Sequence, residues 1–147
     1  GKAHQMTKKI LHGASLRDWD TPEKKAVYWS GACYALMAVT NLYGCKRGAI
    51  RDTIVKAHTE AYDRLYADGR RAGASLDCDW NRLTPEQRAW YSMGAADALT
   101  DVLDALPDSV IDHCPTGLRT LRGARQAWID KNQRIADNFA RKAGLLK

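Results

Sequence analysis

Residues 21–39 of this chain read TPEKKAVYWSGACYALMAV, and residues 84–102 read TPEQRAWYSMGAADALTDV. The two stretches align without a gap and are identical at 10 of 19 positions. The tetrapeptide GASL precedes both of them, at residues 13–16 and 73–76. A repeat of this kind sets the architecture of a chain, because each copy forms the same structural unit. The sequence therefore predicts an internal duplication.

The repeat continues more weakly beyond the aligned stretches. A Cys-x-x-Gly pattern follows each of them, at Cys45–Gly48 and at Cys114–Gly117. A chain of 147 residues can form one ordinary domain or two intimately packed halves. We expect residues 1–72 to form a first helical repeat and residues 73–147 a second. The predicted fold is one compact all-α domain, stabilised by disulfides, in which the repeats pack about a pseudo-two-fold axis.

Both aligned stretches begin like helices. In Thr-Pro-Glu, the threonine caps free N–H groups, proline suits the first turn and glutamate complements the helix dipole. We expect these helices to run to about Leu42 and Leu106, with Pro107 ending the second. The extra residues around 81–83 are expected to form a loop.

The remaining pattern is also helical. Apolar residues recur at helical spacing after the first Cys-x-x-Gly, and Gly69 is expected to end that helix. A corresponding face follows the second Cys-x-x-Gly, and a last helix is expected near residues 133–143. No stretch alternates convincingly like a strand. The two stripes are Ile50, Ile54, Ala57, Ala61 and Leu65, and Leu118, Leu121, Trp128 and Ile129.

Glycine lies in the middle of both predicted long helices, at Gly31 and Gly94. Glycine inside a helix costs about 0.5–1 kcal/mol relative to alanine. Its presence in both copies predicts close approach of another backbone at this point. The partner is expected to be the equivalent helix of the other copy, or the following helix of the same copy.

Catalytic motifs are missing from the sequence. The four histidines are scattered, and no nucleophile elbow, phosphate-binding loop, zinc-protease or dinucleotide fingerprint occurs. The segment Asp77–Asp79 has no acidic pair as its counterpart in the first copy. There is no Cys-x-x-Cys, and His113 beside Cys114 has no partner motif for zinc. We therefore expect a protein that is not an enzyme and that has no cofactor and no metal.

The four cysteines predict a disulfide framework if the chain is exported. Cys78 and Cys114 flank the second long helix, and a bridge between them would stabilise the fold by roughly 2–4 kcal/mol. Cys33 and Cys45 would then pair with each other. That pairing requires the first long helix to end early, near Thr40. If it does not, Cys33 is a buried free thiol.

The net charge of +6 is unevenly distributed. Residues 1–72 contain 13 Lys and Arg against 7 Asp and Glu, whereas residues 73–147 contain 10 of each. The first copy contains an excess of basic residues, and the second contains an acidic series. Each set is either part of the solvated surface or a contact for a charged partner. A basic nucleic-acid-binding protein is the alternative, although no recognition motif accompanies the basic residues. The predicted partner-binding residues are Lys46, Arg47, Arg51, Asp97, Asp101 and Asp104.

Further landmarks occur in the same order in both copies. In the second copy they are Trp80, Thr84, Arg88, Tyr91, Gly94, Ala98, Cys114, Pro115 and Gly117. In the first copy they are Trp19, Thr21, Lys25, Tyr28, Gly31, Ala35, Cys45 and Gly48. This pattern resembles that of the HdeA-like superfamily and, within it, of the Rap/Tai type VI secretion immunity proteins. The match of the second copy continues through Trp128, Ile129 and the last helix, whereas the first copy matches less well and lacks the proline after its cysteine.

The resemblance implies a small, exported, all-helical protein that binds other proteins. Its expected partner is a toxin that it occludes, as an immunity protein would, or an unfolding client that it protects at acid pH, as a periplasmic chaperone would. A periplasmic or secreted location is expected, with a signal peptide removed; a removed purification tag is equally compatible with the first residue. No run approaches the ~20 apolar residues of a membrane span. The oligomeric state, monomer or dimer, stays open.

Overall fold

The computed structural model describes residue 11 and residues 21–42, 49–72, 79–106 and 130–144, and all regular structure within these ranges is helical. The helices are α1 (Pro22–Leu42), α2 (Ala49–Ala72), the short 3₁₀ helix η3 (Trp80–Arg82) and α3 (Pro85–Ala105). A further helical segment covers residues 130–142. The predicted all-α class is confirmed. None of the described helices is long and apolar enough to cross a membrane.

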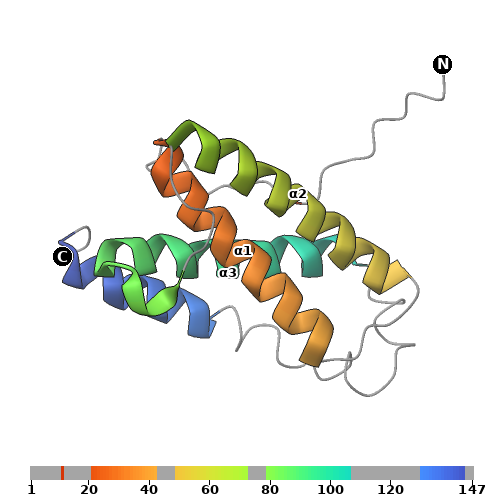
Figure 1. The fold of residues 1–147 in the computed structure, drawn as a ribbon. Coiled ribbons are helices and arrows are strands. Elements are labelled where there is room, and N and C mark those ends of the chain that lie inside the picture. The colour runs from red at the N-terminus through yellow and green to blue at the C-terminus, as the bar shows by residue number, and fades with distance from the viewer. Residues whose placement is uncertain (1–10, 12–20, 43–48, 73–78, 107–129, 145–147) are drawn as a thin grey trace.

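Helix α1 lies at the centre of the described fold. It packs extensively against α2 on one side and α3 on the other, whereas α2 and α3 hardly touch each other. Figure 1 shows α1 crossing α3, with the segment 130–142 running beside the first half of α3. The core consequently forms along both sides of α1.

The threonines start the two long helices as predicted. The Thr84 side chain accepts a hydrogen bond from the Gln87 amide at 3.1 Å, and the Gln87 side chain accepts one from the Thr84 amide at 2.9 Å. This reciprocal pair is a capping box, which satisfies two N–H groups at once. Thr21 caps α1 more weakly, through one bond from the Lys24 amide at 3.3 Å.

Helix α2 buries the predicted apolar stripe from Ile54 onward, and the side chain of Ile50 lies outside the described part of the structure. Ile54, Ala57, Ala61 and Leu65 are all at most 7% exposed. The prediction that Gly69 ends this helix is wrong, because α2 continues to Ala72. A glycine ends a helix by adopting positive φ, and Gly144 alone among the described residues does so.

The glycines of the two repeats meet where α1 crosses α3. A Cβ atom built on Gly31 would lie 1.9 Å from the carbonyl oxygen of Tyr91, and one built on Gly94 would lie 1.9 Å from that of Tyr28. The predicted close approach of another backbone is confirmed, and of the two partners left open the structure shows the equivalent helix of the other copy. The two contacts are reciprocal, because Tyr28 and Gly31 occupy the alignment positions of Tyr91 and Gly94.

Of the two alternatives for Cys33, the structure contains the buried free thiol. Helix α1 runs to Leu42 and does not end near Thr40, so the condition for pairing with Cys45 is not met. Cys45, Cys78 and Cys114 lie outside the described residues, as do Pro107 and the second apolar stripe at residues 118–129.

Candidate functional site

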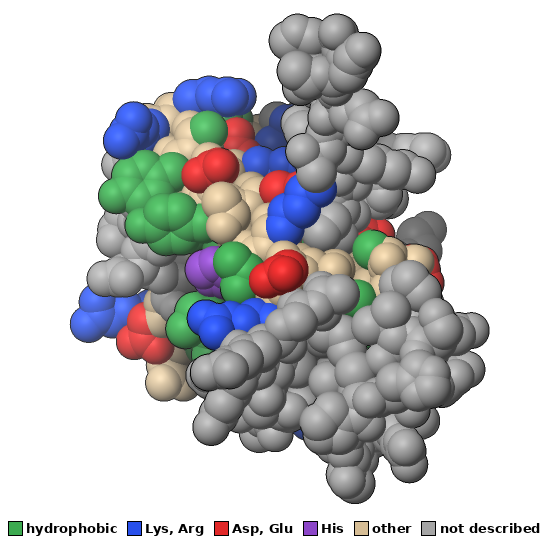
Figure 2. Space-filling view, turned by 90° about the vertical axis from the view of Figure 1, so that its right-hand side faces the viewer, with side chains coloured by type: hydrophobic (Ala, Val, Ile, Leu, Met, Phe, Trp, Pro, Cys, Tyr) green, Lys and Arg blue, Asp and Glu red, His purple; other side chains and the backbone are tan. Residues whose placement is uncertain are grey.

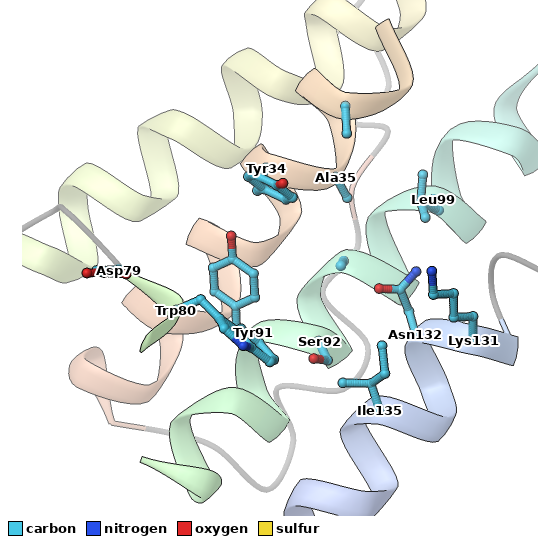
Figure 3. A pocket seen from close by; sticks show the side chains of 12 residues that line it. Tyr34, Ala35, Asp79, Trp80, Tyr91, Ser92, Leu99, Lys131, Asn132 and Ile135 are labelled. Atoms are coloured by element: carbon cyan, nitrogen blue, oxygen red, sulfur yellow. The ribbon is translucent and has the colours of Figure 1, made fainter. Parts of the chain in front are cut away.

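A pocket of about 690 Å³ opens between α1, α3, η3 and the segment 130–142. Figure 3 shows the side chains that surround it. Three aromatic residues, Tyr34, Trp80 and Tyr91, form one side of its lining. Small or apolar side chains make up most of the other described lining residues, together with three that are charged or carry an amide. These further lining residues are Ala35, Ala38, Ser92, Ala95, Leu99 and Ile135, and Asp79, Lys131 and Asn132.

The aromatic wall is held in place by ring contacts. The Trp80 ring lies 5.6 Å from that of Tyr91 and 5.5 Å from that of Phe139, both in edge-to-face arrangements. Arg88 covers Trp80 from 5.0 Å, and its Nε donates a hydrogen bond to the Trp80 carbonyl oxygen at 3.1 Å. Cation–π contact and edge-to-face packing both fix ring orientation. The wall is therefore preformed and does not depend on a ligand.

Tyr34 extends the aromatic wall to the surface. Its ring lies 6.3 Å from that of Tyr91, and 64% of the residue is exposed. Met37, one helical turn further along α1, is 53% exposed. Residues three apart on a helix are neighbours on its surface. The pocket is thus bordered by exposed apolar side chains.

A second exposed aromatic row follows helix α2. His58 stacks on Tyr62, Tyr62 contacts Tyr66, and Arg70 covers the Tyr66 ring at 5.0 Å. Tyr62 and Val55, on the same side of the helix, are each 47% exposed. Figure 2 shows hydrophobic side chains gathered beside a histidine on this face. Every large hydrophobic residue that is exposed in the described structure lies on α1 or α2.

A partly buried polar contact joins the two repeats at the helix crossing. Tyr28 is 1% exposed, and its hydroxyl donates a hydrogen bond to the carboxylate of Asp97. Burial, together with the negative charges of Asp97 and Asp101, raises the pKa of the Tyr28 hydroxyl, and nearby Arg64 opposes this effect. The hydroxyl consequently stays protonated and acts as a donor.

The position that Asp97 occupies in the second repeat has a different residue in the first repeat. The alignment pairs Asp97 with Tyr34, and Tyr28 with Tyr91. Tyr28 therefore contacts a carboxylate, whereas Tyr91 contacts the Tyr34 ring. One divergence in sequence thus produces a buried polar contact on one side of the crossing and an aromatic pocket wall on the other.

The predicted partner-binding residues occupy separate places. Lys46 and Arg47 lie outside the described residues, and Arg51 is exposed near the start of α2. Asp104 is exposed near the end of α3 and Asp101 is half-buried; neither lines the pocket. Their role in binding stays a prediction, although Asp97 is engaged within the fold.

The segment Asp77–Asp79 is described only at its last residue. Asp79 caps η3, since its carboxylate accepts a hydrogen bond from the Asn81 amide at 3.1 Å and lies 3.8 Å from Nε of Arg82. The expected loop at 81–83 is therefore a 3₁₀ turn with a structural cap. Within the described ranges, no three His, Cys, Asp or Glu side chains are grouped so that they could hold a metal ion.

Sequence reasoning did not predict the pocket. The signal that could have indicated it is the pairing of Trp29 in the first repeat with Ser92 in the second, a large change in side-chain volume. A comparison with known proteins provides no further guide: no family model, no curated protein and no solved structure matches the chain.

Proposed function

We propose that this protein is a non-enzymatic protein-binding domain in which two divergent repeats form a fused pseudo-dimer. The reciprocal contacts of Gly31 with Tyr91 and of Gly94 with Tyr28 support the pseudo-two-fold arrangement. Reciprocal contacts of this kind are typical of two-fold interfaces. A fused pair can diverge at each position, so it can present an asymmetric binding surface.

The observation that carries the proposal is the exposed apolar surface beside the pocket. Tyr34 and Met37 are more than half exposed although both are large and apolar. Large apolar patches on a protein surface mark interaction sites, and aromatic residues and methionine are enriched in protein interfaces. The preformed aromatic wall beneath Tyr34 adds a concave feature, which suits a protruding partner side chain.

We further propose that the partner is a secreted toxin, which this domain occludes as an immunity protein would, after its own export to the periplasm or the outside of the cell. The resemblance to the Rap/Tai immunity proteins supports this choice. The test is isothermal titration calorimetry of the purified chain against each purified toxin encoded beside its gene. At least one should bind, and Tyr34→Ala should weaken binding by about tenfold or more, as expected for an interface anchor.

The control is Ala67→Ser, which changes an exposed residue of α2 that is not among the lining residues of the pocket. It should leave the affinity unchanged. If none of the neighbouring toxins binds the chain, the immunity proposal is wrong.

An acid-stress chaperone is the second candidate, and the Tyr28–Asp97 contact favours it. The hydrogen bond joins α1 to α3 and has a carboxylate as its acceptor, and hydrogen bonds to charged groups are stronger than those between neutral groups. A chaperone of this type would loosen at this contact in acid and expose apolar surface. Binding of a hydrophobic dye should rise between pH 7 and pH 2 in the native chain. Dye fluorescence that stays flat over this range would exclude the chaperone.

A further inference from the structure

The pocket lies where the second repeat lacks a ring that the first repeat contains. Trp29 in α1 is 3% exposed, packs edge-to-face on Tyr28 and is covered by Arg64 at 4.5 Å. The aligned residue in α3 is Ser92, which is also 3% exposed and lines the pocket. A serine leaves open the space that an indole would fill. The divergence at this position thus places a small side chain in the wall of the cavity where the first repeat has an indole.

The size and walls of the pocket suit a flat apolar group. Its volume of about 690 Å³ lies within the range of ligand pockets, roughly 300–1,000 Å³. Trp80 and Tyr91 offer faces and edges against which another ring can pack, and Ile135 lines the pocket from the segment 130–142. In Figure 3, Ser92 lies between two walls: Trp80 and Tyr91 are on one side of it, and Ile135 is on the other side.

The charge at the pocket favours an anion. Of the two charged side chains among the described lining residues, Asp79 is already engaged by the Asn81 amide and Arg82. Lys131 is exposed, and within the described part of the chain its ammonium forms no ion pair. A carboxylate attached to a bound apolar group would find a positive charge there. The same position would disfavour a cation.

We propose that this pocket is the anchor site for the protein partner, and that it takes an aromatic side chain whose peptide segment carries a carboxylate within reach of Lys131. This inference rests on the proposed protein-binding function. It adds to that function the chemistry of the contact: an aromatic ring against Trp80 and Tyr91, and an acidic group at Lys131.

The first experiment uses two small probes with the same ring and opposite charge. Solutions of 3-phenylpropionate and 3-phenylpropylamine are titrated into the isotopically labelled full chain, and amide and methyl NMR signals are followed. The carboxylate should shift the signals of Ser92, Ala95 and Ile135 and should bind about fivefold or more tightly than the amine, as expected for one solvent-exposed charge contact. Equal binding of both probes, or no shift of these signals, would overturn the inference.

Two sets of variants separate charge from shape. Lys131→Glu should reverse the preference between the probes, whereas Lys142→Glu, the same change on the same segment outside the pocket lining, should not. Ser92→Trp, which copies the first repeat, should abolish binding of both probes, while Ser92→Ala should retain it. If Ser92→Trp does not fold by circular dichroism, Ile135→Phe fills the pocket from the opposite wall and should have the same effect. If a folded variant with a filled pocket binds the probes as tightly as the native chain does, the inference is overturned.

A competition experiment separates this inference from the proposed function. A partner that binds through the pocket should displace 3-phenylpropionate and should lose affinity for Ser92→Trp. A partner that binds both forms equally would leave the protein-binding function standing and overturn the anchor site. Selective probe binding, with no protein partner found, would uphold the pocket chemistry but overturn the partner assignment and the proposed function.

Discussion

Alanine at either crossing glycine should force α1 and α3 apart. The added Cβ would lie 1.9 Å from a backbone carbonyl oxygen, and such contacts essentially never fall below 3.0 Å, so the helices must separate by at least 1.1 Å at Gly31 or Gly94. Overpacking typically costs about 1–3 kcal/mol, and a rigid backbone neighbour places this case at the upper end. The higher helix propensity of alanine offsets this cost by up to about 1 kcal/mol. The expected net loss is therefore ~2 kcal/mol for each variant.

Thermal and urea unfolding followed by circular dichroism measure this loss. A change of ~2 kcal/mol in a chain of this size corresponds to roughly 4–8 °C in Tm. Because both glycines lie at one crossing, the double variant should lose less than the sum of the single losses. Ala67→Gly, at an exposed site on α2, measures how much the difference in helix propensity between alanine and glycine alone changes the stability of this protein. Gly31→Ala or Gly94→Ala with unchanged or raised stability would refute the close crossing of these helices.

Three further predictions concern other features of the fold. Tyr28→Phe removes the donor to the half-buried Asp97 carboxylate and should lower the free energy of unfolding by about 1–3 kcal/mol at pH 7; an unchanged urea midpoint would contradict this. Burial raises the pKa of the Cys33 thiol to about 11 from 9.0. The neutral thiol therefore contributes its full stabilisation below about pH 9 and loses it as pH rises through 11. The free energy of unfolding, measured with urea, should fall over this range in the native chain and should fall less in Cys33→Ala. Thr84→Ala should lower stability by about 1 kcal/mol and by more than Thr21→Ala, because only Thr84 forms a reciprocal capping box; equal Tm losses would argue against that difference.

Local signals in the sequence predicted local structure well. The Thr-Pro-Glu starts, the apolar stripe of α2 and the last helix all depend on residues within a few positions of one another. The prediction for Gly69 is wrong because a helix end requires a particular backbone conformation, which glycine permits but does not have to adopt. The 3₁₀ turn at Trp80–Arg82 was missed, since short turns of this kind have little periodicity to detect.

The duplication and the close approach at the two glycines followed from the sequence, because a residue kept in both copies at a cost in helix stability requires a reason in packing. The pocket depended on tertiary structure. It is the space left where α1, α3, η3 and the segment 130–142 meet. Its volume depends on how Ser92, Tyr34 and Ile135, far apart in the chain, face one another. A sequence records the substitution of tryptophan by serine between repeats, but whether neighbours fill the vacated space or leave it open depends on how the helices pack together.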